Sequence, residues 1–469
     1  MIHVGQVKQI DVLPDVVLLE IFDFYVKTYS TQGKKRGVER WQLLVHVCRQ
    51  WRSLVFQSPR RLNLQLFCKP KTPAKDTLDV WPALPLIVEG YIDLISGTDN
   101  VIAALGQSNR VCKVDLDVAG WQLEEVLAAT QVSFPQLTYL WLTSDGETLP
   151  VIPDSFLDGS APRLQYFILE GISFPGLPKV LLSSTHLVHL RLSDIPHSGY
   201  FSPEAIVALL SVLSSLEWLV LRFQSPQSPP GRETRRPPPS KRFVIPALIS
   251  LRFKGVNEYL EDLVTGIDTP QLDDMQITFF NQIDFDTQRL AQFINRTPKL
   301  WKRGAHVQFY DDSAYVELSP GLKTLAITIS CREPDWQLSS IEQVCSSSLN
   351  PLSTVEDLYI EHKYRRLVWK NDAIENILWL QLLLPFTAVQ NLYLSKEFAP
   401  GIAAALQQLV GGRIIEVLPS LQNIFVEKFE PSGPFQKNIA QFVAVRRLSD
   451  HRIAISVWDG LNTPNVKSM

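Results

Sequence analysis

The chain has 469 residues, a formal net charge of −3 and a pI near 6.3. One ordinary globular domain rarely grows so long, so we expect several domains or a repeat array. The slightly acidic balance argues against a dedicated nucleic-acid-binding protein, which is usually basic. No secretory signal and no membrane-spanning run is recognised, and five scattered cysteines form no C-x-x-C motif. These features favour a cytosolic or nuclear protein.

The first predicted element is a short helix with an apolar face. Pro14 has no amide hydrogen and a fixed φ, so it suits the first turn of a helix. Val17, Leu18, Ile21 and Phe22 recur at the three-and-four spacing that places side chains on one helix face. We therefore expect this face to be buried, either inside the protein or against a partner.

A second short helix is predicted around the stretch VCRQWRSLVF, residues 47–56. Val45, Cys48, Trp51 and Val55 recur at the same helical spacing, and Pro59 is expected to end the helix. The residues alone leave two interpretations open. The helices form either a hairpin that packs on the rest of the fold or a module that keeps surface for another protein.

From about residue 107 onward one phrase, L-x-x-L-x-L, returns with variations. Its last positions alternate as in a short half-buried strand, and helical patterns fill the segments between copies. Ser202 before Pro203 and Glu204 gives one such helix an N-cap, an N1 proline and an acidic first turn. Strands, all parallel and neighbouring in chain order, are predicted near residues 140, 167, 190, 219, 251, 275, 325, 358, 392 and 424. An ordinary α/β sheet with longer, less uniform strands is the alternative.

The phrase, at a spacing of roughly 22 to 34 residues, resembles leucine-rich repeats over about three quarters of the chain. The asparagine or cysteine that follows the strand in that family is mostly missing, so an irregular array is expected. The resemblance implies an α/β fold, a right-handed solenoid with parallel strands on one face and helices on the other.

The two opening helices resemble an F-box, and the downstream runs SPRRLNLQLFC and DVWPALPLIVEG resemble the fungal, mushroom-type branch of that family. The matching positions are Leu13, Pro14, Leu18, Ile21, Phe22, Val47, Cys48, Trp51 and Leu54. The resemblance implies that these residues bind a Skp-type adaptor, and through it a cullin, while the repeats bind a protein substrate. The chain would then be the substrate-recognition subunit of a Skp–cullin–F-box ubiquitin ligase. A stand-alone leucine-rich-repeat scaffold without a ubiquitin link is the alternative.

The predicted domains are an F-box-like helical module at residues 1–65, a linking or capping segment at 66–106, and the solenoid at 107–469. Residues 224–242 are rich in proline and serine and carry a basic cluster. They are expected to form a disordered loop, either simply solvated or used in nuclear import or anion binding.

Strand residues that point away from the core are predicted to bind the substrate on the concave face. Those singled out are Tyr139, Trp141, Tyr166, His189, Arg191, Trp218, Arg222, Arg252, Lys254, Tyr359 and Tyr393. Aromatic and arginine side chains are enriched at interfaces. The middle of the row is basic, which favours an acidic or phosphorylated substrate segment. A solvated face without a ligand is the alternative.

Motifs for catalysis are not found in the sequence. Phosphate-binding loops, a nucleophile elbow and the H-E-x-x-H zinc motif are absent. His186 and His189 flank leucines of a predicted strand, which favours ordinary surface histidines over a metal site. We therefore expect a non-catalytic protein without metal or cofactor, whose partners include neither nucleic acid nor membrane.

Overall fold

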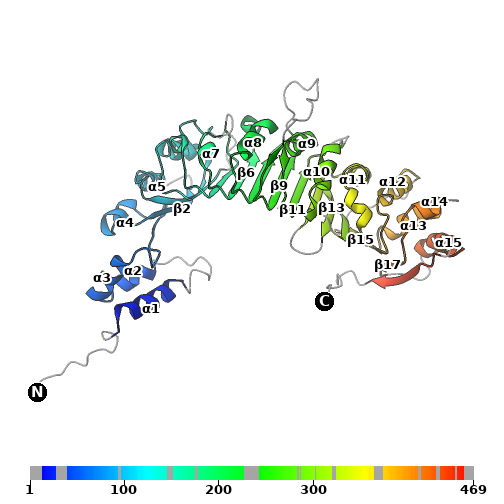
Figure 1. The fold of residues 1–469 in the computed structure, drawn as a ribbon, viewed down its shortest axis with the longest axis horizontal. Helices are drawn as coiled ribbons and strands as arrows, with labels where there is room; N and C mark the ends of the chain where they lie inside the picture. Colours follow the sequence, from blue (N-terminus) through cyan, green and yellow to red (C-terminus); the bar gives the residue numbers. More distant parts are fainter. Residues whose placement is uncertain are drawn as a thin grey trace, which may run out of the picture.

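The computed structural model describes residues 13–27, 40–92, 97–144, 151–174, 178–226, 242–281, 285, 287–300, 303–319, 324–363, 373–409, 413–428, 434–448 and 451–458. These residues form a mixed α/β structure with one long sheet and a small helical module at its N-terminal end. The sheet curves into an arch whose outer side carries the helices and whose inner side carries the strands (Figure 1).

The long sheet contains sixteen strands in the order β1-β2-β3-β4-β5-β6-β7-β9-β11-β14-β13-β12-β15-β16-β17-β18. Their bounds are β1 (Leu66–Cys68), β2 (Leu86–Ile92), β3 (Val111–Val118), β4 (Tyr139–Thr143), β5 (Tyr166–Glu170), β6 (His189–Ile195), β7 (Trp218–Phe223), β9 (Ser250–Gly255), β11 (Asp274–Phe279), β12 (Gly304–Phe309), β13 (Ser313–Ser319), β14 (Leu325–Ser330), β15 (Asp357–His362), β16 (Asn391–Leu394), β17 (Asn423–Glu427) and β18 (Ala454–Trp458). Two short strands, β8 (Phe243–Val244) and β10 (Ile267–Asp268), pair separately.

Helices follow the strands along the outer side of the arch, after three that belong to the N-terminal module. Their bounds are α1 (Asp15–Lys27), α2 (Arg40–Val45), α3 (Arg49–Gln57), α4 (Ala74–Val80), α5 (Thr98–Leu105), α6 (Leu123–Ala129), α7 (Val180–Ser183), α8 (Pro203–Leu210), α9 (Asn257–Thr265), α10 (Gln288–Asn295), α11 (Pro334–Ser348), α12 (Ala373–Leu383), α13 (Ala399–Gln407), α14 (Arg413–Glu416) and α15 (Pro434–Leu448). No helix in the described ranges is long and apolar enough to cross a membrane.

The repeated L-x-x-L-x-L phrase supplies the core of the sheet. In the copy that ends in β4, Leu137, Leu140 and Leu142 are fully buried. Leu140 pairs in register with Phe167 of β5, and Phe167 pairs with Leu190 of β6, so equivalent apolar side chains stack from strand to strand. They belong to one hydrophobic core that runs along the arch. Each predicted strand centre lies inside a strand of the sheet, which confirms these positions.

The prediction that all strands are parallel and follow chain order is wrong at one place. β12 and β13 form an antiparallel hairpin, closed by the Tyr310 amide donating to the Ser313 carbonyl at 2.8 Å. β13 also pairs antiparallel with β14, whereas β14 and β12 run parallel to β11 and β15. The physical reason is the short connection, because a parallel crossover needs a dozen or more residues. Asp311 and Asp312 in this turn favour chain reversal.

The sheet also begins earlier than predicted. Residues 66–106, expected to be a linking or capping segment, contain β1, α4, β2 and α5. Leu66 pairs with Leu86, and β2 pairs in parallel with β3, so these strands extend the long sheet. β1 and β2 do not carry the L-x-x-L-x-L phrase, and for that reason these two strands were not predicted.

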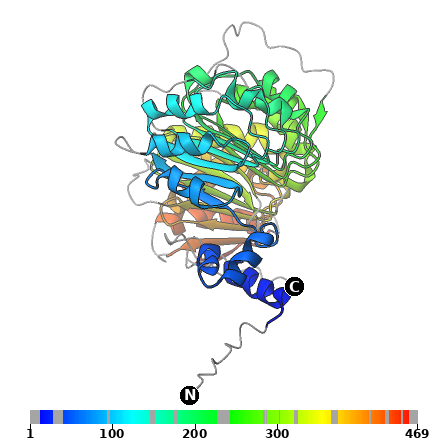
Figure 2. The same ribbon diagram turned by 90° about the vertical axis from the view of Figure 1, so that its left-hand side faces the viewer.

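The helical module contacts the first strands through tryptophan side chains. Trp41 Nε1 donates to the Gln65 carbonyl at 3.1 Å, and the Trp41 and Trp81 rings lie 5.0 Å apart between centroids. Figure 2 shows the module at the lower end of the arch, beside the first strands of the sheet. The core of the module is continuous with that of the sheet.

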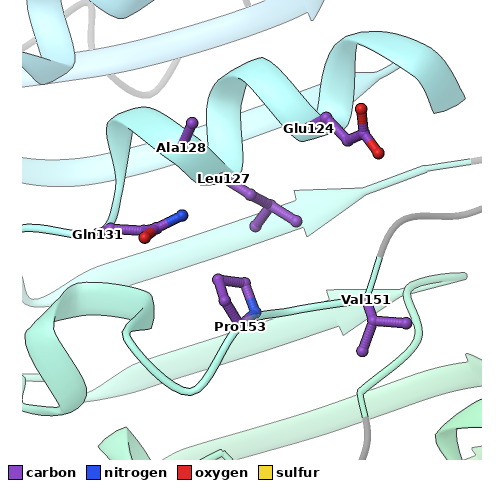
Figure 3. Close-up of a pocket in the computed structure, with 6 residues that line it drawn as sticks. All are labelled: Glu124, Leu127, Ala128, Gln131, Val151 and Pro153. Carbon is purple, nitrogen blue, oxygen red and sulfur yellow. The ribbon is translucent and has the colours of Figure 1, made fainter.

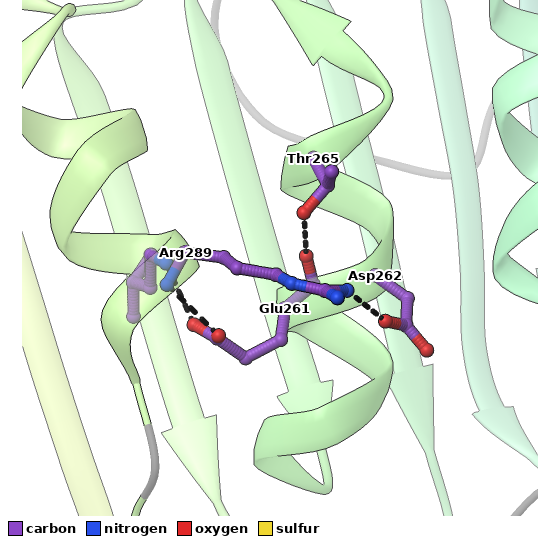
Figure 4. Close-up of polar contacts among 5 residues, drawn as sticks. Glu261, Asp262, Thr265 and Arg289 are labelled. Carbon is purple, nitrogen blue, oxygen red and sulfur yellow. Dashed lines mark hydrogen bonds and ion pairs between the residues drawn. The ribbon is translucent and has the colours of Figure 1, made fainter. Parts of the chain in front are cut away.

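Polar side chains on the outer side tie successive helices together. The Glu261 carboxylate on α9 is buried and accepts from the backbone amides of Arg289 at 2.9 Å and Leu290 at 2.6 Å (Figure 4). These amides belong to the first turn of α10, where an acceptor satisfies otherwise orphan donors and complements the helix dipole. Arg289 Nη1 also donates to Asp262 at 2.7 Å, and the Thr265 hydroxyl donates to the Glu261 carbonyl.

Arginine side chains also connect successive units, by hydrogen bonds to main-chain carbonyls. Arg446 on α15 is fully buried, and its Nη2 donates to the carbonyls of Val417 and Leu418 at 2.7 Å each. Arg296 similarly donates to the Val264 carbonyl and to Asp268. Both guanidinium groups satisfy main-chain acceptors of the preceding unit and are thereby fixed in the structure.

The predicted cap at Ser202 is confirmed, since its hydroxyl accepts from the Ala205 amide at 3.3 Å and Pro203 begins α8. The expected loop at 224–242 lies mostly outside the described residues, which omit 227–241.

Candidate functional site

The inner face of the sheet carries rows of side chains, because its strands pair in register. Alternate residues of a strand point to opposite faces, and those not buried under the helices lie on the inner face. One row consists of Lys113, Tyr139, Tyr166, His189 and Trp218, each paired with the next across β3 to β7. The structure therefore places four of the predicted residues, Tyr139, Tyr166, His189 and Trp218, in adjacent positions.

Contacts along this row join its rings into one aromatic surface. The Lys113 ammonium lies 4.6 Å from the Tyr139 ring centroid. Successive centroid separations are 5.5 Å for Tyr139 and Tyr166, 6.0 Å for Tyr166 and His189, and 6.3 Å for His189 and Trp218. Tyr166 and Trp218 remain exposed, so they offer apolar area to a ligand.

Trp141 lies on the same face, one row further along. Its Nε1 donates to the Thr143 hydroxyl at 2.8 Å, which fixes the indole. The side chain is half-buried.

Arg191 is already engaged by its neighbours. Its Nη2 lies 3.0 Å from Glu170 Oε2, and its Nε donates to the Ser193 hydroxyl at 3.0 Å. Glu170 is on the adjacent strand β5, so the pair is a cross-strand contact that neutralises the charge of Arg191. That Arg191 binds substrate on the concave face stays a prediction; in the structure its guanidinium is paired with Glu170.

Arg222, Arg252 and Lys254 have more free donors. Arg222 faces Lys254 directly across β7 and β9, and Arg252 precedes Lys254 on the same face. Arg252 Nη2 is 3.9 Å from Asp274, too far for a hydrogen bond, and its buried Nε has no acceptor. No carboxylate among the described residues forms a hydrogen bond or ion pair with Arg222 or Lys254. These three cations therefore have donors available to a ligand.

The electrostatics of this region reflect burial and crowded positive charge. Burial, followed by the repulsion of Arg191 and Arg252, lowers the pKa of Arg222, while Asp194 and Glu170 oppose the change. The same order of causes, burial and then Arg191 and Arg252, lowers the pKa of His189. The lowered pKa disfavours the charged form of His189, so the available positive charge of this region lies on Arg222, Arg252 and Lys254.

At the C-terminal end of the inner face, rings stack into a compact ladder. The centroids of His306 and Tyr359 are 4.3 Å apart, those of Tyr359 and Tyr393 are 4.2 Å apart, and those of Tyr393 and Phe425 are 4.6 Å apart. The ring planes of each pair are nearly parallel. Trp458 packs edge-on against both tyrosines. Tyr359 and Tyr393 are only 7% and 9% exposed, which corrects their predicted role as exposed substrate-binding residues. Stacking with their neighbours makes them part of a second small core.

Beside this ladder runs a row of polar side chains. Asn391 Nδ2 donates to Asp357 at 2.7 Å, and Asn423 Nδ2 donates to Asn391 at 2.8 Å. Each group has its partner on the neighbouring strand, so the row stabilises the register of β15, β16 and β17.

In the helical module, several predicted adaptor contacts form its core. Leu18, Phe22 and Leu54 are buried, and the Phe22 and Trp51 rings lie 4.7 Å apart. Cys48 caps α3, its sulfur accepting from the Trp51 amide at 3.5 Å. The prediction that Leu18, Phe22 and Leu54 contact a partner directly is corrected, because their side chains hold the three helices together.

Other apolar side chains of the module face solvent. They are Val16, Val17, Ile21, Phe24, Leu43 and Val47, and Pro14 is also exposed while Leu13 is half-buried. Phe24 is 71% exposed and Val47 is 59% exposed, unusual values for such residues in a single small module. Ile21, Val47 and Pro14 were predicted to contact the adaptor, and Val16, Phe24 and Leu43 are exposed apolar side chains that were not named in that prediction. The spacing of Val17, Ile21 and Phe24 along one helix side was the signal available in the sequence.

A shallow hollow of about 230 Å³ lies between α6 and residues 151–153 (Figure 3). It is lined by Glu124, Leu127, Ala128, Gln131, Val151 and Pro153. Glu124 is the one ionisable side chain in this lining. No group of three or more His, Cys, Asp or Glu side chains in the described part of the chain is arranged to hold a metal ion.

No family model matches the chain, and no curated protein matches it.

Proposed function

We propose that the chain is a non-catalytic substrate receptor of a Skp–cullin–F-box ubiquitin ligase. In this proposal the helical module is an F-box, and the long sheet with its helices is an irregular leucine-rich-repeat solenoid. The recurrence of the leucine phrase, the stacking of its side chains and the mostly parallel strands support the second assignment.

The observation that carries the proposal is the apolar surface of the module. Three short helices bury Leu18, Phe22 and Leu54 between them and still leave large apolar side chains in contact with water. An exposed apolar surface of this kind marks a site for another protein. Its position at one end of the arch leaves the inner face of the sheet available for a second partner.

The proposed partners follow from this division. The module would bind a Skp-type adaptor, and through it a cullin, while the inner face binds a protein substrate. Exposed Tyr166 and Trp218 and the cations of β7 and β9 are the side chains suited to that contact. The proposed complex would act in the cytoplasm, the nucleus or both, without a cofactor.

Co-expression of the full chain with a Skp-type adaptor tests the assignment. The adaptor is expected to co-purify with the tagged chain in a stoichiometric complex through size-exclusion chromatography. Co-expression of the adaptor with an unrelated protein that carries the same tag serves as the control. If the folded chain retains no Skp-type adaptor, the ligase assignment fails and a stand-alone interaction scaffold takes its place.

A further inference from the structure

We propose that Arg222, Arg252 and Lys254 form an anion-binding subsite for one acidic or phosphorylated side chain of an extended peptide. This inference rests on the proposed function in one respect, namely that the inner face binds a protein substrate. It assigns the chemistry of recognition to three residues on β7 and β9 and gives Arg191 a different role.

Unused hydrogen-bond donors are the first argument. Arg252 Nε is buried without an acceptor, and its Nη2 lies 3.9 Å from the nearest carboxylate. A buried donor without a partner is unfavourable, so a ligand that supplies an acceptor there gains free energy. The Lys254 ammonium lies 5.5 Å from the centroid of the Phe280 ring and has no carboxylate partner among the described residues, so it can reach a ligand oxygen as well.

Cations elsewhere on the same face show that these free donors are a local feature. Lys113 lies 2.9 Å from Asp115, and Arg191 is held by Glu170 and Ser193. Arg222, in contrast, has no such partner among the described residues. The sheet therefore carries paired cations on β3 and β6 and available cations on β7 and β9.

The acidic groups nearby do not neutralise the subsite. Glu170 is bound to Arg191, and Asp274 accepts from the Ser250 hydroxyl at 2.7 Å and from the Gln276 amide at 3.3 Å. Asp194 is exposed at the irregularity between β6 and β7, and it acts on Arg222 only through space. Among the described residues, Asp274 is thus the one carboxylate within ion-pair distance of the three cations, and a ligand can supply further negative charge.

The geometry suits a group with several acceptor oxygens. Arg222 and Lys254 are register partners on adjacent strands, which lie about 4.8 Å apart. Two guanidinium forks and an ammonium can share the oxygens of one phosphate or one carboxylate. Exposed Trp218 precedes Arg222 on the same strand and face, so an extended peptide could place an apolar side chain beside the anion.

Peptide arrays with the purified full chain test the proposal. The arrays hold otherwise randomised peptides with a central phosphoserine, glutamate or serine, and a labelled peptide from the strongest spots is then titrated in solution. Phosphoserine or glutamate arrays should retain the chain, and serine arrays should not. The ratio of the amount of chain retained on the phosphoserine arrays to that on the glutamate arrays shows whether a phosphate or a carboxylate supplies the anion. Arg222→Gln and Lys254→Gln should each weaken binding by about tenfold or more.

Lys179→Gln is the control, because it removes a cation that is paired with Asp154 at the start of α7, away from the inner face, and its affinity should equal that of the parent. Thermal unfolding of every variant verifies that the fold is retained. Equal retention on all three arrays, no retention on any, or unchanged affinity of both variants would overturn the subsite. Tighter binding of single-stranded oligo-dT than of any peptide would instead assign the cations to nucleic acid. Adaptor binding should be unaffected by these changes, because they lie on the sheet and not in the helical module, so failure here is separable from failure of the proposed function.

Discussion

Tyr359 and Tyr393 lie ring against ring on adjacent strands, with centroids 4.2 Å apart and planes inclined by 8°. Phe425 continues the stack at 4.6 Å from Tyr393, so Tyr393 contacts a ring on each side. Tyr393→Ala should reduce the free energy of unfolding by about 3–5 kcal/mol, as expected for loss of a buried aromatic side chain. Urea denaturation measures the loss. Tyr166→Ala is the control, because Tyr166 is exposed and its nearest ring is 5.5 Å away; equal losses for the two variants would contradict the buried ladder.

Leu190 tests the core assigned to the repeated phrase. The side chain is fully buried and stacks between Phe167 and Leu219 of the neighbouring strands. Leu190→Ala should lower the free energy of unfolding by about 2–5 kcal/mol. Leu182→Ala, at a 59% exposed position on α7, should change it by about 0.5 kcal/mol or less. Similar effects of the two changes would show that the phrase does not define the core.

Substitution of Glu261 tests the hydrogen bonds that connect α9 with the first turn of α10. Glu261→Ala leaves the amides of Arg289 and Leu290 without their acceptor, and it should cost about 1–3 kcal/mol of stability. Glu261→Gln keeps a carbonyl acceptor of similar size and should cost less. Chemical denaturation of the three proteins provides the comparison, and equal stability of parent and alanine variant would exclude the cap.

His306 gives the stability of the fold a pH dependence. Burial lowers the pKa of His306 below 6.5, Lys363 adds to this, and Glu361 and Glu317 oppose it. Below about pH 6.5 the unfolded chain binds a proton at this histidine that the folded chain resists, so stability is lost as the pH falls through that range. His306→Gln should therefore show a smaller fall in the urea midpoint than the parent between about pH 7.5 and about pH 5.5. A fall as large as that of the parent would contradict the assignment.

Much of the strand layout could be predicted because the phrase places its apolar residues on one face of each strand. Leu137, Leu140 and Leu142 are buried for that reason. β13 could not be placed in the same way, since its alternation lacks the phrase and its partners are chosen by a short turn. The Asp311-Asp312 pair was the available signal for that reversal.

The candidate site was predictable in its residues but less so in their pairing. The inner-face position of Arg191 followed from strand alternation, whereas its bond to Glu170 depends on the register of two strands that the sequence does not reveal. The burial of Tyr359 likewise results from rings contributed by three other strands. Patterns along one strand report which face a residue occupies, but contacts across strands decide whether it is free.

The affinity of the full chain for a Skp-type adaptor, measured by titration with purified components, tests the central claim most directly. The parent is expected to bind, and Ile21→Glu combined with Val47→Glu should weaken binding by about a hundredfold or more, because charges replace exposed apolar anchors without entering the module's core. Leu182→Glu, a charge placed at an equally exposed apolar position on α7, should bind as the parent does. Equal affinity of the double variant and the parent, or no binding by the folded parent, would contradict the account.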